Sequence, residues 1–206
     1  NMTEIPLRED AIFFHFDVAP FASDKQILDY HLDKLMTKDE SKVLASDIAL
    51  QVFGNQKICI IGSNGCGKTT LLHKIHEYLS EREDIHIGYM PQNYDEILDA
   101  YESPIDFLIT VGDKEDITRI RQYLGSMKFT SDEMEHSLRE LSGGQRAKVF
   151  MLKMHLEGAN VLLLDEPTRN FSPLSAPVVR EELKNFGGAI IAVSHDRKFI
   201  QEVFDD

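Results

Sequence analysis

Cysteine is scarce in this 206-residue sequence, which contains only Cys59 and Cys66. One lies in an apparent strand and the other in a glycine-rich loop, so they give no disulfide framework, and reduced thiols are typical of cytosolic proteins. Long apolar runs are also missing, because the longest stretches, 58–61 and 161–164, fall far short of the roughly 20 residues of a membrane-spanning helix. No signal-peptide pattern opens the chain. We therefore expect a cytoplasmic protein without direct membrane insertion.

Basic residues are few as well. The sequence has 22 Lys and Arg against 35 Asp and Glu, a formal net charge of −13 at pH 7. Nucleic-acid affinity rests largely on basic side chains that neutralise phosphates, so we expect any RNA contact of the parent protein to lie in another part of it. Hydrophobic residues make up 42% of the chain, an ordinary value for a folded globule, and this length favours one domain, 1–206.

Short apolar runs alternate with helical patterns, which indicates an α/β fold with a largely parallel central sheet. Buried strands are expected at 57–61, 85–90, 160–164 and 189–193. Apolar residues at helical spacing predict helices at 68–79, 144–156, 104–111 and 114–125. The strand signal fades between the second and third strands, and we interpret 93–140 as a small helical subdomain. Weaker β-like runs at 11–16 and 48–53 indicate an N-terminal antiparallel β portion.

A phosphate-binding loop is predicted between the first central strand and the helix that follows it. The sequence there is Gly62-Ser63-Asn64-Gly65-Cys66-Gly67-Lys68-Thr69, which has the P-loop spacing of glycines, lysine and hydroxyl residue. Glycines let backbone N–H groups turn toward phosphate oxygens, and the helix N-terminus adds positive potential. Lys68 supplies a charge for the β and γ phosphates, the Thr69 hydroxyl suits Mg²⁺, and Thr70 continues the site. An ordinary glycine-rich turn is the alternative.

Two carboxylates, Asp165 and Glu166, follow the strand expected at 160–164. Ligands gather at the carboxyl ends of parallel strands, so these acids should lie beside the P-loop. We expect Asp165 to hold Mg²⁺ through water and Glu166 to act on the water that attacks the γ-phosphate. His195 follows the strand expected at 189–193 and is placed to reach the same phosphate. The alternative is a strand that simply ends in solvated acids.

Further motifs make the chain similar to ATP-binding cassette (ABC) proteins. The run Leu141-Ser142-Gly143-Gly144-Gln145 resembles the ABC signature, although alone it also suits a turn and a helix N-cap. Gln92, after Gly88-Tyr89-Met90-Pro91, resembles the glutamine of the family. The resemblance covers most of the chain from about Lys42 onward, with the motifs in the family's order. It implies a P-loop NTPase core, ATP and Mg²⁺ as ligands, and Gln92 as both a metal ligand and a catalytic residue.

The resemblance also implies a partner domain. In ABC proteins two such domains face each other, and the signature of one closes over ATP held by the P-loop of the other. Ser142, Gly143, Gly144 and Gln145 would therefore contact the nucleotide of a second ABC domain, in the same full-length chain or in a homodimer. A lone domain would then be a weak ATPase.

Local details are most similar to the ABC-F branch, soluble proteins with two such domains, many of which act on the ribosome. These details are Tyr123-Leu124-Gly125 with Phe129, 145–148, 194–197 and Phe13-Phe14-His15-Phe16. The last resembles the lead into the second domain, so 1–30 is interpreted as the end of an inter-domain linker and a first strand. The leading hypothesis is an ATPase domain that acts in translation, with antibiotic resistance as one such role and ribosome contacts made by parts outside this sequence. The alternatives are the ATPase subunit of a membrane transporter and a non-hydrolysing ATP-dependent binding module.

Some features depart from the family's pattern. No aromatic residue stands between Tyr30 and Phe53 to stack on adenine, and Met36 is the polarizable candidate there. The ABC-F run after the catalytic glutamate continues Asn, His, Leu, Asp, but this chain has Arg169-Asn170-Phe171-Ser172. The missing Asp weakens the expected link between two ATP sites. The sequence also ends at Asp206, soon after the histidine, so we expect a C-terminally truncated domain.

Overall fold

The computed structural model describes residues 16–63 and 67–204, and its centre is a four-stranded parallel sheet. The strands are β3 (Lys57–Ile60), β4 (Ile87–Met90), β5 (Val161–Asp165) and β6 (Ala189–Val193). Their order across the sheet is β3-β6-β5-β4, and each neighbouring pair is parallel. The α/β class and the four predicted central strands are confirmed, with small differences at the strand ends.

Apolar side chains cover both faces of this sheet. In β5, Leu162 and Leu164 belong to one core, whereas Val161 and Leu163 belong to the other, because side chains alternate along a strand. The first core includes side chains of α6 (Gly143–Leu156), α7 (Ala176–Lys184) and α8 (Arg197–Val203), and the second includes those of α1 (Lys68–Leu79). Burial on both faces explains why these strands are continuous apolar runs.

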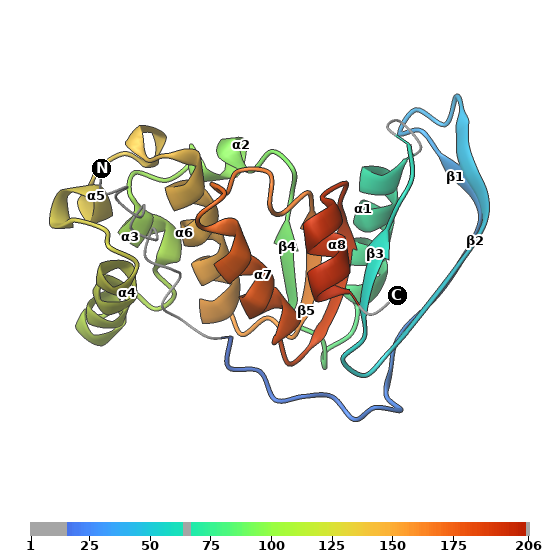
Figure 1. Ribbon diagram of the computed structural model, residues 1–206, viewed down its shortest axis with the longest axis horizontal. Helices are drawn as coiled ribbons and strands as arrows, with labels where there is room; N and C mark the ends of the chain where they lie inside the picture. The colour runs from blue at the N-terminus through green and yellow to red at the C-terminus, as the bar shows by residue number, and fades with distance from the viewer. Residues whose placement is uncertain (1–15, 64–66, 205–206) are drawn as a thin grey trace, which may run out of the picture.

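The N-terminal part is an antiparallel hairpin of two 11-residue strands, β1 (Gln26–Met36) and β2 (Val43–Phe53). Figure 1 shows it at one end of the molecule. The antiparallel portion is confirmed, but the strand expected at 48–53 was much too short and its partner was missed. Register shifts at both ends of β1 interrupt the apolar alternation by which a strand is recognised. The other β-like run, 11–16, lies outside the described residues except for Phe16.

Helices fill the chain between β4 and α6, and Figure 1 shows α3, α4 and α5 at the end of the molecule opposite the hairpin. They are α2 (Asp95–Leu98), α3 (Pro104–Leu108), α4 (Lys114–Ser126), α5 (Ser131–Glu135) and the 3-10 turn η1 (Leu138–Glu140). The predicted helices at 104–111 and 114–125 correspond to α3 and α4, while α2 and α5 were not predicted. Within 16–63 and 67–204, no helix is both long enough and apolar enough to cross a membrane.

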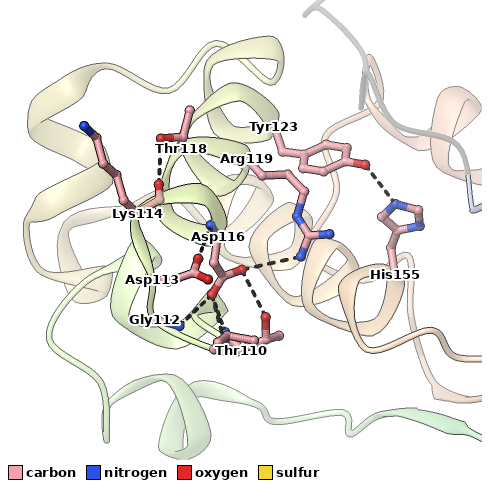
Figure 2. Close-up of polar contacts among 10 residues, drawn as sticks. Thr110, Gly112, Asp113, Lys114, Asp116, Thr118, Arg119, Tyr123 and His155 are labelled. Carbon is pink, nitrogen blue, oxygen red and sulfur yellow. Dashed lines mark hydrogen bonds and ion pairs between the residues drawn. The ribbon is translucent and has the colours of Figure 1, made fainter.

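Asp116 explains why α3 ends before the predicted position. Its carboxylate accepts hydrogen bonds from the backbone N–H groups of Thr110, Val111 and Gly112 at 2.9 to 3.0 Å (Figure 2). These bonds, from Gly112 first, hold the pKa of Asp116 well below its usual range. Gly112 has a φ of +83°, a left-handed conformation that suits glycine. The backbone after α3 therefore turns around this side chain instead of continuing the helix.

Candidate functional site

The predicted phosphate loop runs from the carboxyl end of β3 to the N-terminus of α1. Asn64, Gly65 and Cys66 lie outside the described residues, whereas Gly62, Ser63 and 67–70 lie within them. Gly67 caps α1 with a φ of +88°. A Cβ atom built on it would lie 2.9 Å from side-chain carbons of Leu35 and of Leu44 in the hairpin. The left-handed backbone conformation therefore favours glycine at this position, and a larger residue would also displace two leucine side chains of the hairpin.

Lys68 extends its ammonium group across the mouth of this loop. The Nζ atom donates to the carbonyl oxygen of Gly62 at 2.6 Å and lies 2.7 Å from Nε2 of His195. An ammonium group has no lone pair, so Nε2 of His195 must accept, and the neutral ring then carries its proton on Nδ1. The contact brings together two of the predicted site residues that are far apart in the sequence.

The acid pair lies at the carboxyl end of β5, directly beside α1. The Thr69 hydroxyl donates to Oδ2 of Asp165 at 2.7 Å, and Asp165 is only 2% exposed. Glu166 follows with a φ of +50°, an uncommon conformation for a side chain of this size, which its backbone N–H supports by donating to the Val193 carbonyl. The His195 backbone N–H lies 3.3 Å from a Glu166 carboxylate oxygen, and its ring Nε2 lies 3.6 Å from the other.

A cavity of about 330 Å³ joins these groups. It is lined by residues from α1, β2, the chain after β4 and the carboxyl ends of β5 and β6, namely Leu44, Gly67, Lys68, Thr69, Thr70, Gln92, Asp165, Glu166, Val193 and His195. Eight predicted site residues therefore meet in one cavity, from Gly67 to His195. Leu44 was missed, because an apolar residue in a half-exposed strand carries no chemical signal, and Met36 is absent from the lining.

The chemistry of the lining suits a magnesium ion bound with phosphates. The Thr69 hydroxyl, the Asp165 carboxylate and the Gln92 amide supply oxygen atoms, the ligands that Mg²⁺ prefers, and the ion usually retains water and phosphate oxygens besides. Behind the lining, burial raises the pKa of the Cys59 thiol to about 11 and, with the nearby charge of Asp165, that of Tyr89 to about 12. Both groups therefore remain neutral at physiological pH.

The signature residues lie elsewhere, at the N-terminus of α6. Ser142 and Gln145 form a capping box, in which each side chain accepts from the other residue's backbone N–H at 3.1 and 3.0 Å. The Gln145 amide also donates to Glu133, and the hydrogen bonds of Thr130 and Gln145 hold the pKa of Glu133 below its usual range. None of the residues from Ser142 to Gln145 is among the described residues that line the cavity.

A P-loop at the carboxyl end of a parallel strand, a buried Asp next to a Glu, and a lysine that contacts the loop carbonyl of Gly62 and His195 define a P-loop ATPase domain. Residues 45–169 match the ABC transporter family, and the chain belongs to this family. Its relatives are of the ABC-F type. It is 32% identical to Protein GCN20 of Saccharomyces cerevisiae over 80% of this chain and 23% of that protein. It is 31% identical to Probable ATP-binding protein YheS of Escherichia coli K12 over 85% and 29%.

ABC transporter F family member 5 of Arabidopsis thaliana is also 31% identical, over 80% of this chain and 25% of that protein. The chain thus spans about a quarter of the length of these relatives. Among solved structures, the fold is similar to that of the ATP-binding cassette MJ0796, a dimer in a post-hydrolysis state bound to ADP and Pi. That similarity has a TM-score of 0.70 at 17% identity and covers 86% of this chain and 91% of the other.

Proposed function

We propose that this domain binds ATP with Mg²⁺ in the cavity beside Lys68 and hydrolyses it, as part of an ABC-F protein that acts on the ribosome. The observation that carries the proposal is the meeting of Lys68, the Thr69–Asp165 pair, Glu166 and His195 in one cavity. ATP binding and ATPase activity in general are properties of the family to which the chain belongs.

The proposed roles follow from the geometry. Lys68, near the loop carbonyl of Gly62, is placed to neutralise the β and γ phosphates, and backbone N–H groups at the start of α1 add to this field. Thr69 and Asp165 would hold the magnesium ion, which draws negative charge from the phosphates when bound. Gln92 would complete the metal and water contacts from the opposite wall.

Glu166 is the proposed general base. Its strained backbone aims the carboxylate at the cavity, and a carboxylate there can orient a water molecule and accept its proton. Once phosphate displaces the contact with Lys68, His195 would carry a ring proton on Nε2 and donate a hydrogen bond from it to the γ-phosphate, because both groups face the same space. The hydrogen bond from the His195 backbone N–H to the Glu166 carboxylate keeps the two residues next to each other.

A second ABC domain is part of the proposal. Ser142 and Gly143 are exposed at the N-terminus of α6, where unpaired N–H groups and the helix dipole favour a phosphate. Since they do not line the chain's own cavity, we infer that they close over the nucleotide of a facing domain. We propose further that 1–206 is one ABC domain, with 1–30 ending a linker and 93–140 as its helical subdomain, in a cytoplasmic protein.

Ribosome sedimentation tests the role in translation. The full-length protein with Glu166→Gln should co-sediment with ribosomes when ATP is present, because it would bind nucleotide without turning it over. The same protein without ATP, and a Lys68→Ala variant with ATP, should remain in the supernatant. Failure of the Glu166→Gln protein to co-sediment with ATP, although it binds ATP, would contradict the ribosomal role and leave the ATPase proposal standing.

A further inference from the structure

Asn170 departs from the ABC-F pattern and makes a contact within its own domain. Its amide Nδ2 donates to the hydroxyl of Tyr94 at 3.1 Å. Tyr94 follows closely after Gln92 and is only 3% exposed, with its ring 5.2 Å from that of Phe150 in α6. The ring is therefore fixed by packing, and its hydroxyl forms a hydrogen bond to the segment that follows Glu166.

A second contact joins Asp95, the residue after Tyr94, to the signature helix. The guanidinium of Arg146, the residue after the signature glutamine, lies 3.0 Å from the carboxylate of Asp95. The Arg146 side chain is 22% exposed, and its Nε is buried without a hydrogen-bond partner among the residues of 16–63 and 67–204. A partly buried ion pair of this kind has specific geometry, and breaking one side leaves a charge without its partner. Tyr94 thus contacts α6 through its ring, and Asp95 contacts the same helix through an ion pair.

The segment after Glu166 is also tied at its start. The Thr168 hydroxyl donates to the Asp196 carboxylate at 2.8 Å, next to His195. Asn170, at the other end, has its carbonyl oxygen 3.7 Å from where a Cβ of Gly143 or Gly144 would lie. The segment is thus held at its start by the Thr168–Asp196 bond and at Asn170 by the bond to Tyr94, beside the N-terminus of α6.

A second cavity, also of about 330 Å³, lies where these segments meet, lined by Gln92, Asn93, Asp95, Arg169 and Asn170. Gln92 lines this cavity and the ATP cavity alike. We call the Tyr94–Asn170 and Asp95–Arg146 contacts the junction. The junction thus adjoins Gln92, the side chain proposed to contact the metal and the attacking water. The residues that contact the nucleotide of this domain and the helix that offers its signature to another domain are connected through Tyr94 and Asp95.

We propose that Tyr94 and Asn170 are positioning residues that couple the state of this domain's own ATP site to the signature at the start of α6, with the Asp95–Arg146 ion pair as the second half of the junction. This inference rests on the proposed ATPase function. It locates the coupling inside one domain, in a chain that has Ser172 where the family has Asp. The Ser172 hydroxyl accepts from the backbone N–H of Ser175 in the same chain.

The test is a double-mutant cycle in the full-length protein. Tyr94→Phe removes the hydroxyl and retains the buried ring, and Asn170→Ala removes its partner. Each should lower kcat for ATP about fivefold, the effect of one hydrogen bond, while KM stays within about twofold and the melting temperature falls by only a few degrees. The double variant should be no slower than either single variant, because the two residues share one interaction. Tyr101→Phe is the matched control, since Tyr101 is an exposed tyrosine in the same stretch of chain after β4, and its ring packs on Phe107.

A readout of the signature itself separates coupling from local structure. In a Glu166→Gln background, ATP should drive association of the two ABC domains at a concentration about fivefold higher when Tyr94→Phe is present. Two results would overturn the coupling and leave the ATPase proposal intact, given that the wild-type protein turns over ATP. One is that Tyr94→Phe has the same turnover as Tyr101→Phe. The other is that the losses caused by Tyr94→Phe and Asn170→Ala add in the double variant. A full-length wild-type protein without turnover would overturn the ATPase proposal and the coupling that rests on it.

Discussion

Asp165→Asn separates a metal-binding role of this carboxylate from a structural one. Without ligand, the asparagine keeps the shape of the side chain and accepts from Thr69, whose hydroxyl is 2.7 Å away. A hydrogen bond to a charged group contributes about 1.5–3 kcal/mol and a neutral one about 1 kcal/mol, so the variant loses about 1–2 kcal/mol there. The charge it removes is 2% exposed, and relief of its desolvation offsets that loss. We expect the ligand-free melting temperature to stay the same or rise.

The response to nucleotide should change. Saturation to about 100 times Kd stabilises a protein by about 2.7 kcal/mol, which raises the melting temperature of a domain of this size by about 5–10 °C. A tenfold loss of affinity, on the order expected for a lost metal contact, leaves about 1.4 kcal/mol and half of that shift. Differential scanning fluorimetry with ATP and Mg²⁺ measures both numbers, and EDTA should reduce the wild-type shift to that of the variant.

Glu181→Gln is the control for loss of one negative charge, because Glu181 is exposed on α7 and is not among the described residues that line the cavity. It should retain the full shift with ATP and Mg²⁺. An Asp165→Asn protein that also retains the full magnesium-dependent shift would refute the metal role. One that unfolds several degrees lower without ligand would show that the carboxylate stabilises the fold.

Two further substitutions test the packing of the loop and the turn after α3. Gly67→Ala should weaken ATP binding on the order of tenfold in calorimetric titration, because the residue has a φ of +88° and its Cβ would meet the hairpin at 2.9 Å. Gly158→Ala, at a φ of +72° with nothing within 4 Å, should leave ATP binding unchanged, and equal losses in the two would contradict the argument. Asp116→Asn should lower the free energy of unfolding in urea at pH 7. Since folding lowers the pKa of Asp116, this stabilisation is present above the unfolded-state pKa of about 3.9 and is lost as pH falls through the folded-state value. The difference in unfolding free energy between the variant and the wild type should therefore shrink below about pH 4. A difference that stays constant with pH would contradict the argument.

The pattern of neighbouring residues in the sequence was sufficient to predict the central sheet and much of the cavity lining. Strands such as β6 are short, apolar and buried on both faces, and Asp165 and His195 follow such strands at the edge where parallel sheets bind ligands. The helix α1 was equally clear, since Leu71 and Ile75 repeat at helical spacing. These features depend on neighbours in the sequence.

The remaining features depend on contacts between distant segments. β1 carries register shifts and, among the described residues, forms a two-stranded sheet with β2, so half-exposed positions hid its pattern. Leu44 enters the cavity because the hairpin folds over Gly67, which no local pattern encodes. The helix at 104–111 was predicted too long because the bonds that Asp116 makes to the backbone were not visible in the sequence. The Tyr94–Asn170 bond spans 76 positions and likewise needed the fold.

The claim that this domain hydrolyses ATP through Glu166 is tested most directly by turnover and binding measured together. The full-length wild-type protein and its Glu166→Gln variant would be compared for phosphate release and for ATP affinity under identical conditions, with Glu181→Gln as the charge control. The account predicts that Glu166→Gln lowers turnover on the order of 100-fold or more while ATP affinity is retained. Turnover by Glu166→Gln equal to that of the wild type would contradict it.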